Sequence, residues 1–168
     1  MGIVLVRETT LAEWEVLRDI RLEALQDSPD FFGSTYQDER AITPMAWRAS
    51  IARGGTFFAY PSGSTGVSPC GLVGGLHEVP DTVELVSLWV RPAARGQGVG
   101  QGLVRAVVDW ARDHRAARVH LWLTKTNDQA LLLYQRWGFA LTGESQPLPS
   151  NPKLTEIGMA RPLNHEAP

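Results

Sequence analysis

The sequence has little cysteine and histidine. It holds one cysteine, Cys70, and four histidines scattered singly along the chain, His77, His114, His120 and His165. A single cysteine excludes an internal disulfide, and no Cys/His spacing resembles a zinc site. We therefore expect no metal.

An excess of basic charge is also lacking. Sixteen Lys and Arg residues against eighteen Asp and Glu residues give a net charge of −2. Nucleic-acid-binding proteins usually carry a basic patch or a Lys/Arg-rich tail, and this chain has no such run. We therefore expect no nucleic-acid partner.

Long hydrophobic runs are missing as well. No apolar stretch approaches the roughly 18 residues that a transmembrane helix needs. The N-terminus, MGIVLVRETT, is too short and too soon charged for a secretory signal peptide. Gly2 follows the first Met as in a myristoylation signal, but Val6 stands where that signal has Ser or Thr. We expect no membrane partner and predict a cytoplasmic protein.

The size and composition are those of an ordinary globular protein. The chain has 168 residues, of which 43% are hydrophobic and 20% charged. This length suits one domain with a real core. No internal repeat and no long linker divides the sequence. We predict a single domain over residues 1–163, followed by a short tail, 164–168.

Apolar spacing and capping residues predict four helices. A capping box of Thr9 or Thr10 with Glu13 marks the first start, and Asn127 caps the last helix. Thr43 and Pro44 begin the second. The predicted helices cover residues 11–28, 43–53, 99–114 and 127–137.

Short β-branched and apolar runs predict strands between and around these helices. They cover residues 3–8, 56–60, 70–79, 83–90, 118–124, 138–143 and 155–161, and we expect 144–153 to be a loop. The order of strands and helices is not uniformly alternating, so it predicts an α+β fold.

Four glycines stand at alternate positions where the strand over 83–90 gives way to a helix. They are Gly96, Gly98, Gly100 and Gly102. Their spacing does not fit the dinucleotide pattern G-x-G-x-x-G, and no lysine lies near for a nucleotide P-loop. The free N–H groups at such a helix start can hold a phosphate, with Arg95 beside them. Close packing of the helix on the sheet is the alternative reason for the glycines.

Two motifs resemble a known family. Residues 95–100, RGQGVG, are similar to the [Q/R]-x-x-G-x-[G/A] signature of the GCN5-related N-acetyltransferases, the GNAT superfamily. The pattern N-x-x-A-x-x-x-Y-x-x-x-G-F, from Asn127 to Phe139, matches a second motif of that family. The order of elements over residues 3–161 also resembles theirs. The resemblance implies a mixed sheet of six to seven strands, about four helices, and a V-shaped slot between strands 83–90 and 118–124.

The resemblance also implies an acetyl-CoA site. The pyrophosphate would lie on the backbone of Gln97, Gly98, Val99 and Gly100, with Arg95 and Gly96 at the rim. The pantetheine arm would pair, like an added strand, with the backbone of Leu88, Trp89 and Val90. Asn127 would hydrogen-bond this arm, a role that can coexist with plain helix capping, and Ala130 would lie beside it.

The implied chemistry is attack of an amine on a thioester. A backbone N–H near Leu88 would polarise the carbonyl. Tyr134, one helical turn beyond Ala130, would protonate the leaving thiolate, although its ring could merely pack. Glu84, 11 residues before Arg95, is the candidate base. It lies roughly 13 Å from Leu88 along an extended strand, which requires a water relay. Alternatively, it lies on a solvated face or only attracts the ammonium.

The acceptor side remains open at this point. The first two helices and the loop 144–153 should form it, and four aromatic residues could line it or belong to the core: Phe31, Phe32, Tyr36 and Trp47. Asp38 and Glu39 could attract an amine or lie on a solvated face. The region around residues 21–39 resembles uncharacterised bacterial GNAT proteins.

Other functions also remain open. The acceptor is expected to be a primary amine of a small molecule, a peptide or a protein, and the acyl group could be longer than acetyl. A non-catalytic acyl-CoA-binding module is the alternative from another class. A homodimer is possible, with Trp89 or Trp122 either at an interface or in the core.

Overall fold

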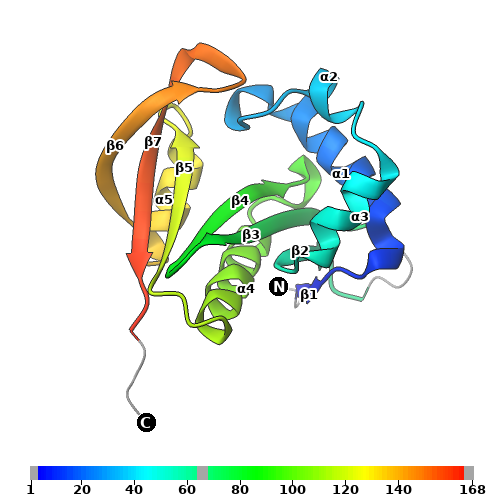
Figure 1. The fold of residues 1–168 in the computed structure, drawn as a ribbon, viewed down its shortest axis with the longest axis horizontal. Coiled ribbons are helices and arrows are strands. Elements are labelled where there is room, and N and C mark those ends of the chain that lie inside the picture. Colours follow the sequence, from blue (N-terminus) through cyan, green and yellow to red (C-terminus); the bar gives the residue numbers. More distant parts are fainter. Residues whose placement is uncertain (1–3, 64–67, 165–168) are drawn as a thin grey trace.

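The computed structural model describes residues 4–63 and 68–164, and a seven-stranded sheet runs through them (Figure 1). The strand order is β1-β2-β3-β4-β5-β7-β6. Only β4 and β5 run parallel; the other neighbouring pairs are antiparallel. The strands are β1 (Leu5–Glu8), β2 (Thr56–Tyr60), β3 (Gly71–Val79), β4 (Thr82–Val90), β5 (Arg118–Thr124), β6 (Ala140–Leu148) and β7 (Asn151–Pro162).

Helices cover both faces of this sheet (Figure 1). They are α1 (Trp14–Asp27), α2 (Tyr36–Glu39), α3 (Pro44–Ala52), α4 (Val99–Asp113) and α5 (Asp128–Arg136), with short 3-10 turns η1 (Leu11–Glu13), η2 (Pro29–Phe31) and η3 (Pro92–Ala94). The predicted α+β class is confirmed. No helix in the described ranges is long and apolar enough to cross a membrane.

Two hydrophobic clusters hold the layers together. One packs α4 against the sheet, with Leu103, Val104 and Val107 fully buried. The other packs α1 and α3 on the opposite face, around Leu25 and Phe58. Each fully buried aliphatic or aromatic side chain contributes about 1.5–3 kcal/mol. Packing on both faces therefore stabilises the sheet even where β4 and β5 do not pair at its centre.

The centre of the sheet opens between β4 and β5. These strands pair only at Thr82–Arg118, Val83–Val119 and Glu84–His120, and they diverge beyond that point. On the other side of β4 the register against β3 slips by one residue around Ser87, whose φ is +63°. Such a bulge bends its strand and increases the local twist. The predicted V-shaped slot is confirmed.

The predicted helix caps are confirmed. The Thr10 N–H donates to Glu13 Oε1 over 2.9 Å. The Thr43 hydroxyl accepts from Ala46 N–H at the start of α3. These side chains satisfy donors that the first helical turn leaves free.

The predicted loop over residues 144–153 is wrong. β6 continues to Leu148 and β7 begins at Asn151, so two residues make the turn. Pro147 lies in the edge strand, where a missing N–H costs little. Pro152 precedes Glu156 in the sequence, and it lies in the part of β7 that does not pair with β5.

Other differences from the predicted elements are small. The first strand begins at Leu5, and the predicted residue 3 lies outside the described residues. Between the first two predicted helices, where no helix or strand was predicted, the chain forms η2 and α2. Of the predicted tail, residues 165–168 lie outside the described part of the chain.

A Glu13→Gln substitution is expected to lower the free energy of unfolding by about 1 kcal/mol at pH 7. In the wild type the Arg7 guanidinium donates hydrogen bonds to the Glu13 carboxylate, and the Thr10 backbone N–H donates another. These bonds lower the pKa of Glu13 from 4.5 to about 2. Because the pKa of Glu13 is lowered in the folded state, its ionised carboxylate stabilises the fold above pH 4.5. This contribution to the free energy of unfolding is lost as the pH falls towards 2.

Denaturant unfolding at several pH values measures this difference. The difference in the free energy of unfolding between wild type and variant should shrink steadily below pH 4.5. Glu15→Gln, at an exposed site of α1, is the matched control and should show a much smaller gap. A gap that stays constant from pH 7 to pH 3 would contradict the assignment.

Candidate active site

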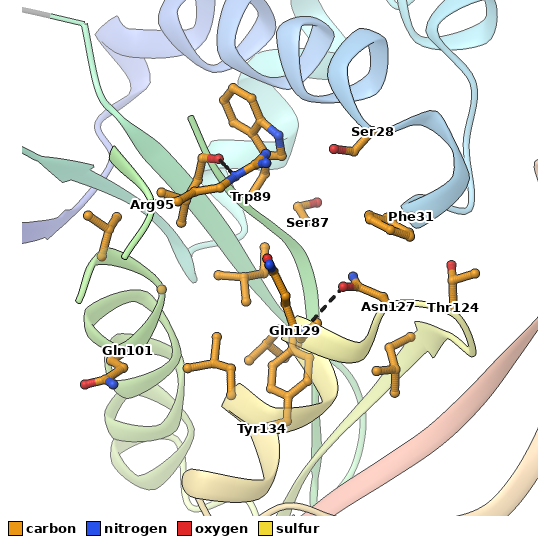
Figure 2. A pocket seen from close by; sticks show the side chains of 18 of the residues that line it. Ser28, Phe31, Ser87, Trp89, Arg95, Gln101, Thr124, Asn127, Gln129 and Tyr134 are labelled. Atoms are coloured by element: carbon orange, nitrogen blue, oxygen red, sulfur yellow. Dashed lines mark hydrogen bonds between the residues drawn. The ribbon is translucent and has the colours of Figure 1, made fainter. Parts of the chain in front are cut away.

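A cavity of about 490 Å³ fills the opening between β4 and β5 (Figure 2). Residues 85–90 of β4 form one wall, and the end of β5 with the start of α5 forms another. The start of α4 closes one end, and Phe31 and Phe32 border the other. The cavity therefore brings the glycine run, the open edge of β4 and α5 to one place.

The start of α4 presents free N–H groups to this cavity. Gly98 is the N-cap, and the first backbone bond of the helix runs from Gly102 N–H to the Gly98 carbonyl. The N–H groups of the residues between them therefore have no partner within the helix. Gly98, Val99, Gly100 and Gln101 all line the cavity. Free N–H groups at the positive end of a helix dipole are able to hold an anion, as predicted for this stretch.

The four glycines serve two different purposes. Gly96 and Gly98 have φ of +75° and +82°, and a Cβ there would meet nothing within 4 Å. Their backbone conformation demands glycine. A Cβ on Gly100 would lie 3.1 Å from Leu133, and one on Gly102 would lie 3.1 Å from Val6. Close packing therefore explains the second half of the run, and the anion site explains the first.

Two predicted pyrophosphate residues use their side chains elsewhere. The Arg95 guanidinium donates to the Val90 carbonyl and to Asp27 Oδ2, over 2.9 and 2.8 Å. Figure 2 shows it lying beside Trp89. The Gln97 side chain donates to the Ala93 carbonyl, and Gln97 does not line the cavity. Arg95 therefore lines the cavity, and its hydrogen bonds also stabilise the turn that follows β4.

Asp27 ties this rim to α1. Its Oδ2 accepts from the Trp89 indole over 3.0 Å and from Arg95. The Ser28 hydroxyl, then the Trp89 indole, lower the pKa of Asp27 below its usual range. Trp89 is 4% exposed, which places this side chain in the core. Trp122, the other candidate for an interface, is partly buried and lines the cavity.

Asn127 and Tyr134 both lie on the cavity wall (Figure 2). The Asn127 oxygen accepts from Ala130 N–H over 3.3 Å, which leaves its NH2 group for a ligand. Tyr134 is 5% exposed and its ring lies 5.6 Å from that of Phe139. Burial raises the pKa of Tyr134 well above its usual value. Its phenol is therefore a hydrogen-bond donor throughout the physiological range.

Glu84 does not line the cavity. Its carboxylate lies 2.9 Å from His120 Nδ1, and His120 Nε2 lies 2.9 Å from Glu144 Oε1. His120 therefore lies between two carboxylates, one at each ring nitrogen. His120 is 5% exposed and joins β4, β5 and β6. The sequence showed His120 only as an isolated histidine, because the contact depends on the β4–β5 register.

The acceptor-side candidates divide between surface and core. Phe31 is 42% exposed and lines the cavity, whereas Phe32 is 7% exposed and reaches both core and cavity. Trp47 is buried in the core beneath α3, and Tyr36 packs against the same cluster. Glu39 does not face solvent, because Arg21 binds it through two hydrogen bonds.

Asp38 and two unpredicted residues complete this description. Asp38 accepts from the Thr35 hydroxyl over 2.8 Å at the start of α2. Thr124 and Gln129 line the cavity although nothing in the sequence indicated them. Their positions follow from the strand end and helix start that surround Asn127.

Comparison with protein families gives one match. Residues 14–139 match the model described as the acetyltransferase (GNAT) family. This stretch contains η3, α4 and α5, and therefore both motifs of the cavity.

Curated relatives are similar over shorter stretches. A probable N-acetyltransferase family 8 member 5 from Mus musculus is 34% identical over 132 residues, which cover 74% of this chain and 55% of that protein. The N-alpha-acetyltransferase RimI from Mycobacterium tuberculosis is 34% identical over 90 residues, which cover 54% of this chain and 49% of that protein. This chain thus spans about half the length of these relatives.

Solved structures show the same fold. An acetyltransferase of the GNAT family from Streptococcus pneumoniae has a TM-score of 0.79 at 18% identity, covering 96% of this chain and all of that one. A putative acetyltransferase from Salmonella typhimurium, solved with its cofactor acetyl-CoA, has a TM-score of 0.77 at 18% identity, covering 99% of this chain and 98% of that one.

A Gly98→Ala substitution is expected to weaken acetyl-CoA binding about tenfold, because alanine at φ +82° costs about 1–2 kcal/mol and turns the free N–H groups away. Gly102→Ala is the matched control, since its Cβ would meet Val6 and not the cavity. It should change the melting temperature and leave the Kd unchanged. Calorimetry measures both. Equal losses of affinity in the two variants would contradict the division of the glycines.

Proposed function

This chain belongs to the acetyltransferase (GNAT) family, and we propose that it transfers the acetyl group of acetyl-CoA to a primary amine. The observation that carries the proposal is the cavity in which an anion-binding helix start meets an open strand edge. A CoA ester needs both, one for its pyrophosphate and one for its amide-bearing arm.

The residues of the cavity fit acetyl-CoA. Gly98, Val99 and Gly100 would offer backbone N–H groups to the pyrophosphate, with Arg95 and Gly96 at the rim and Gln97 contributing its backbone alone. Residues 88–90 would pair with the pantetheine amides, because no described strand lies beside β4 there on the β5 side. Asn127 would donate its free NH2 group to the same arm, next to Ala130.

Acetyl-CoA supplies an activated acetyl thioester, and the chain supplies hydrogen bonds and proton acceptors. The backbone N–H at Leu88, beside the bulge, would donate to the thioester oxygen. The amine loses one proton and forms a C–N bond to the acetyl carbon, and the C–S bond breaks. The sulfur leaves as a thiol after it gains a proton.

Tyr134 is the proposed donor to the sulfur. A phenol with an ordinary pKa of about 10 is already a weaker acid than a thiol of about 8.5. Burial raises the pKa of Tyr134 further, which favours a hydrogen bond to the departing sulfur over early, complete proton transfer. The phenol would then stabilise negative charge on the sulfur as the C–S bond breaks.

Glu84 is the proposed base, acting at a distance. Its contact with His120 places it at the closed end of the slot, outside the cavity wall. A water molecule must therefore carry the proton from the amine to the carboxylate. His120 and Glu144 would hold the Glu84 carboxylate in one orientation.

Release of free thiol from acetyl-CoA over a panel of primary amines tests the proposed function. Turnover that depends on an amine supports it. Binding of acetyl-CoA without turnover of any amine would favour a non-catalytic CoA-binding module. The same assay with succinyl-CoA tests whether the acyl group is longer. Location in the cytoplasm and a homodimer remain predictions.

Tyr134→Phe is expected to lower kcat about 100-fold, because it removes the donor to the sulfur. The Kd for acetyl-CoA should stay within about twofold, since the ring and its contact with Phe139 are kept. Thiol release and calorimetry measure the two quantities on the same preparation. An unchanged kcat would leave Tyr134 with a packing role alone.

Glu84→Gln is expected to lower kcat/KM about tenfold at neutral pH and to make it rise with pH, as the free amine replaces the base. Glu78→Gln, an exposed glutamate on β3 that only approaches Arg53, is the matched control and should keep the wild-type profile. Thiol release from pH 6 to 10 provides both profiles. A wild-type profile for Glu84→Gln would exclude its role as base.

A further inference from the structure

A second cavity, of about 220 Å³, lies between the sheet and the helices α1 and α3. It is bordered by α1, the segment from Glu39 to Trp47, α3 and strands β3 and β4. Val86 and Ser87 line this cavity and also the acetyl-CoA cavity. The two cavities therefore meet at the bulge of β4, where the thioester would lie. Cavities for drug-sized ligands measure about 300–1,000 Å³, so this one suits a smaller molecule.

Arg21 lies at the meeting point of the two cavities. Its side chain is 12% exposed, and Nε and Nη2 both donate to Glu39 over 2.9 Å. Nη1 approaches the Ser87 hydroxyl at 3.3 Å, and the guanidinium stacks 4.8 Å from the centre of the Phe32 ring. A guanidinium has five N–H donors, and these contacts use three. Two donors thus have no protein partner among the described residues.

The two spare donors suit a carboxylate. Arginine binds carboxylates through pairs of parallel N–H···O bonds, and its planar group is held here by Glu39 and Phe32. Glu39 neutralises the charge of Arg21, and the two spare N–H groups, one on Nη1 and one on Nη2, are the donors left for a ligand. A preorganised guanidinium next to the thioester position therefore favours an acceptor that carries a carboxylate close to its amine.

The rest of the cavity is mainly apolar. Leu17 and Trp47 contribute buried side chains, and Leu76 and Val86 are partly buried on the sheet. The Trp47 indole N–H is buried without a partner in the described residues, which leaves an unused donor in this wall. Ser50 and Thr56 are the small polar residues there. These walls suit an aliphatic or aromatic side chain of modest size.

We propose that the second cavity binds a free α-amino acid with an apolar side chain as the acetyl acceptor. This inference rests on the proposed function. Arg21 binds the carboxylate, the side chain lies against Leu17 and Trp47, and the α-amine faces Ser87. The α-ammonium loses one proton to solvent or to the base, and the neutral amine then forms the C–N bond to the acetyl carbon. The C–S bond breaks, the nitrogen loses its second proton, and the sulfur takes up one proton, so that CoA leaves as its thiol.

The first experiment compares L-leucine with isoamylamine, which differ only in the carboxylate. Wild type is expected to show a kcat/KM for L-leucine at least tenfold higher than for isoamylamine, the effect of charge-assisted hydrogen bonds. Arg21→Gln should bring this ratio close to one and leave the Kd for acetyl-CoA unchanged. Because that variant leaves Glu39 buried without its partner, Arg21→Gln with Glu39→Gln is measured in parallel. A ratio that neither variant changes would overturn the proposal.

The second experiment fills the cavity. Ser50→Phe places a ring inside it, whereas Ala49→Phe places the same ring on the exposed face of α3, outside the cavity lining. Ser50→Phe should lower kcat/KM for L-leucine at least tenfold without changing the Kd for acetyl-CoA. Ala49→Phe should match wild type. Equal activity of the two variants would overturn the proposal.

The outcomes separate this inference from the proposed function. If acetyl-CoA does not bind, or binds without turnover of any amine, the proposed function fails. If a polyamine or a peptide is acetylated and L-leucine, L-methionine and L-phenylalanine are not, the inference alone fails. Calorimetry of L-leucine with the CoA-loaded protein gives an answer independent of turnover, because no detectable binding would also overturn the inference.

Discussion

The parallel pairing of β4 and β5 ends after three residue pairs, and the proposed site depends on this early end. Backbone N–H and C=O groups need partners, and beyond Glu84 and His120 the facing edge of β4 has no described strand to provide them. A ligand with its own amides can complete the sheet there. The contact of His120 with Glu84 and Glu144 fixes the point at which the strands part, since it joins β4, β5 and β6. A longer ladder would close the cavity.

Helix α1 keeps the open edge of β4 in place from the other face. Three of its polar side chains reach β4 and the turn after it at successive levels. Arg21 contacts Ser87, Glu23 binds Arg91 through two bonds of 2.9 Å, and Asp27 binds Trp89 and Arg95. The charge-assisted contacts of Glu23 and Asp27 are directional, so they fix the end of β4 and the turn after it. Helix α1 borders the second cavity through Leu17 and Arg21, and Ser28, the residue after its last turn, lines the first cavity.

The two cavities differ in the charge and burial of their polar groups. In the first cavity the start of α4 directs backbone dipoles at the proposed pyrophosphate position, and the proposed proton donor is a buried phenol whose raised pKa keeps it neutral. In the second cavity Arg21 is paired with Glu39. A buried phenol beside the proposed sulfur position suits a reaction in which negative charge develops on a thiolate.

The sequence by itself determined most of the helices and strands and the helix caps, and it predicted an anion site at the start of α4. Periodicity is a local property, and the spacing of Gly96 and Gly98 reports a backbone conformation that only glycine adopts easily. Local rules also misled, because Pro147 resembles a loop residue until its strand is known to be the sheet edge. The tertiary structure alone decided which side chains meet: Glu84 with His120, Arg21 with Glu39 and Ser87, and Arg95 with Asp27. These residues lie 18 to 68 positions apart, and their contacts follow from strand register and helix packing, which no local pattern records.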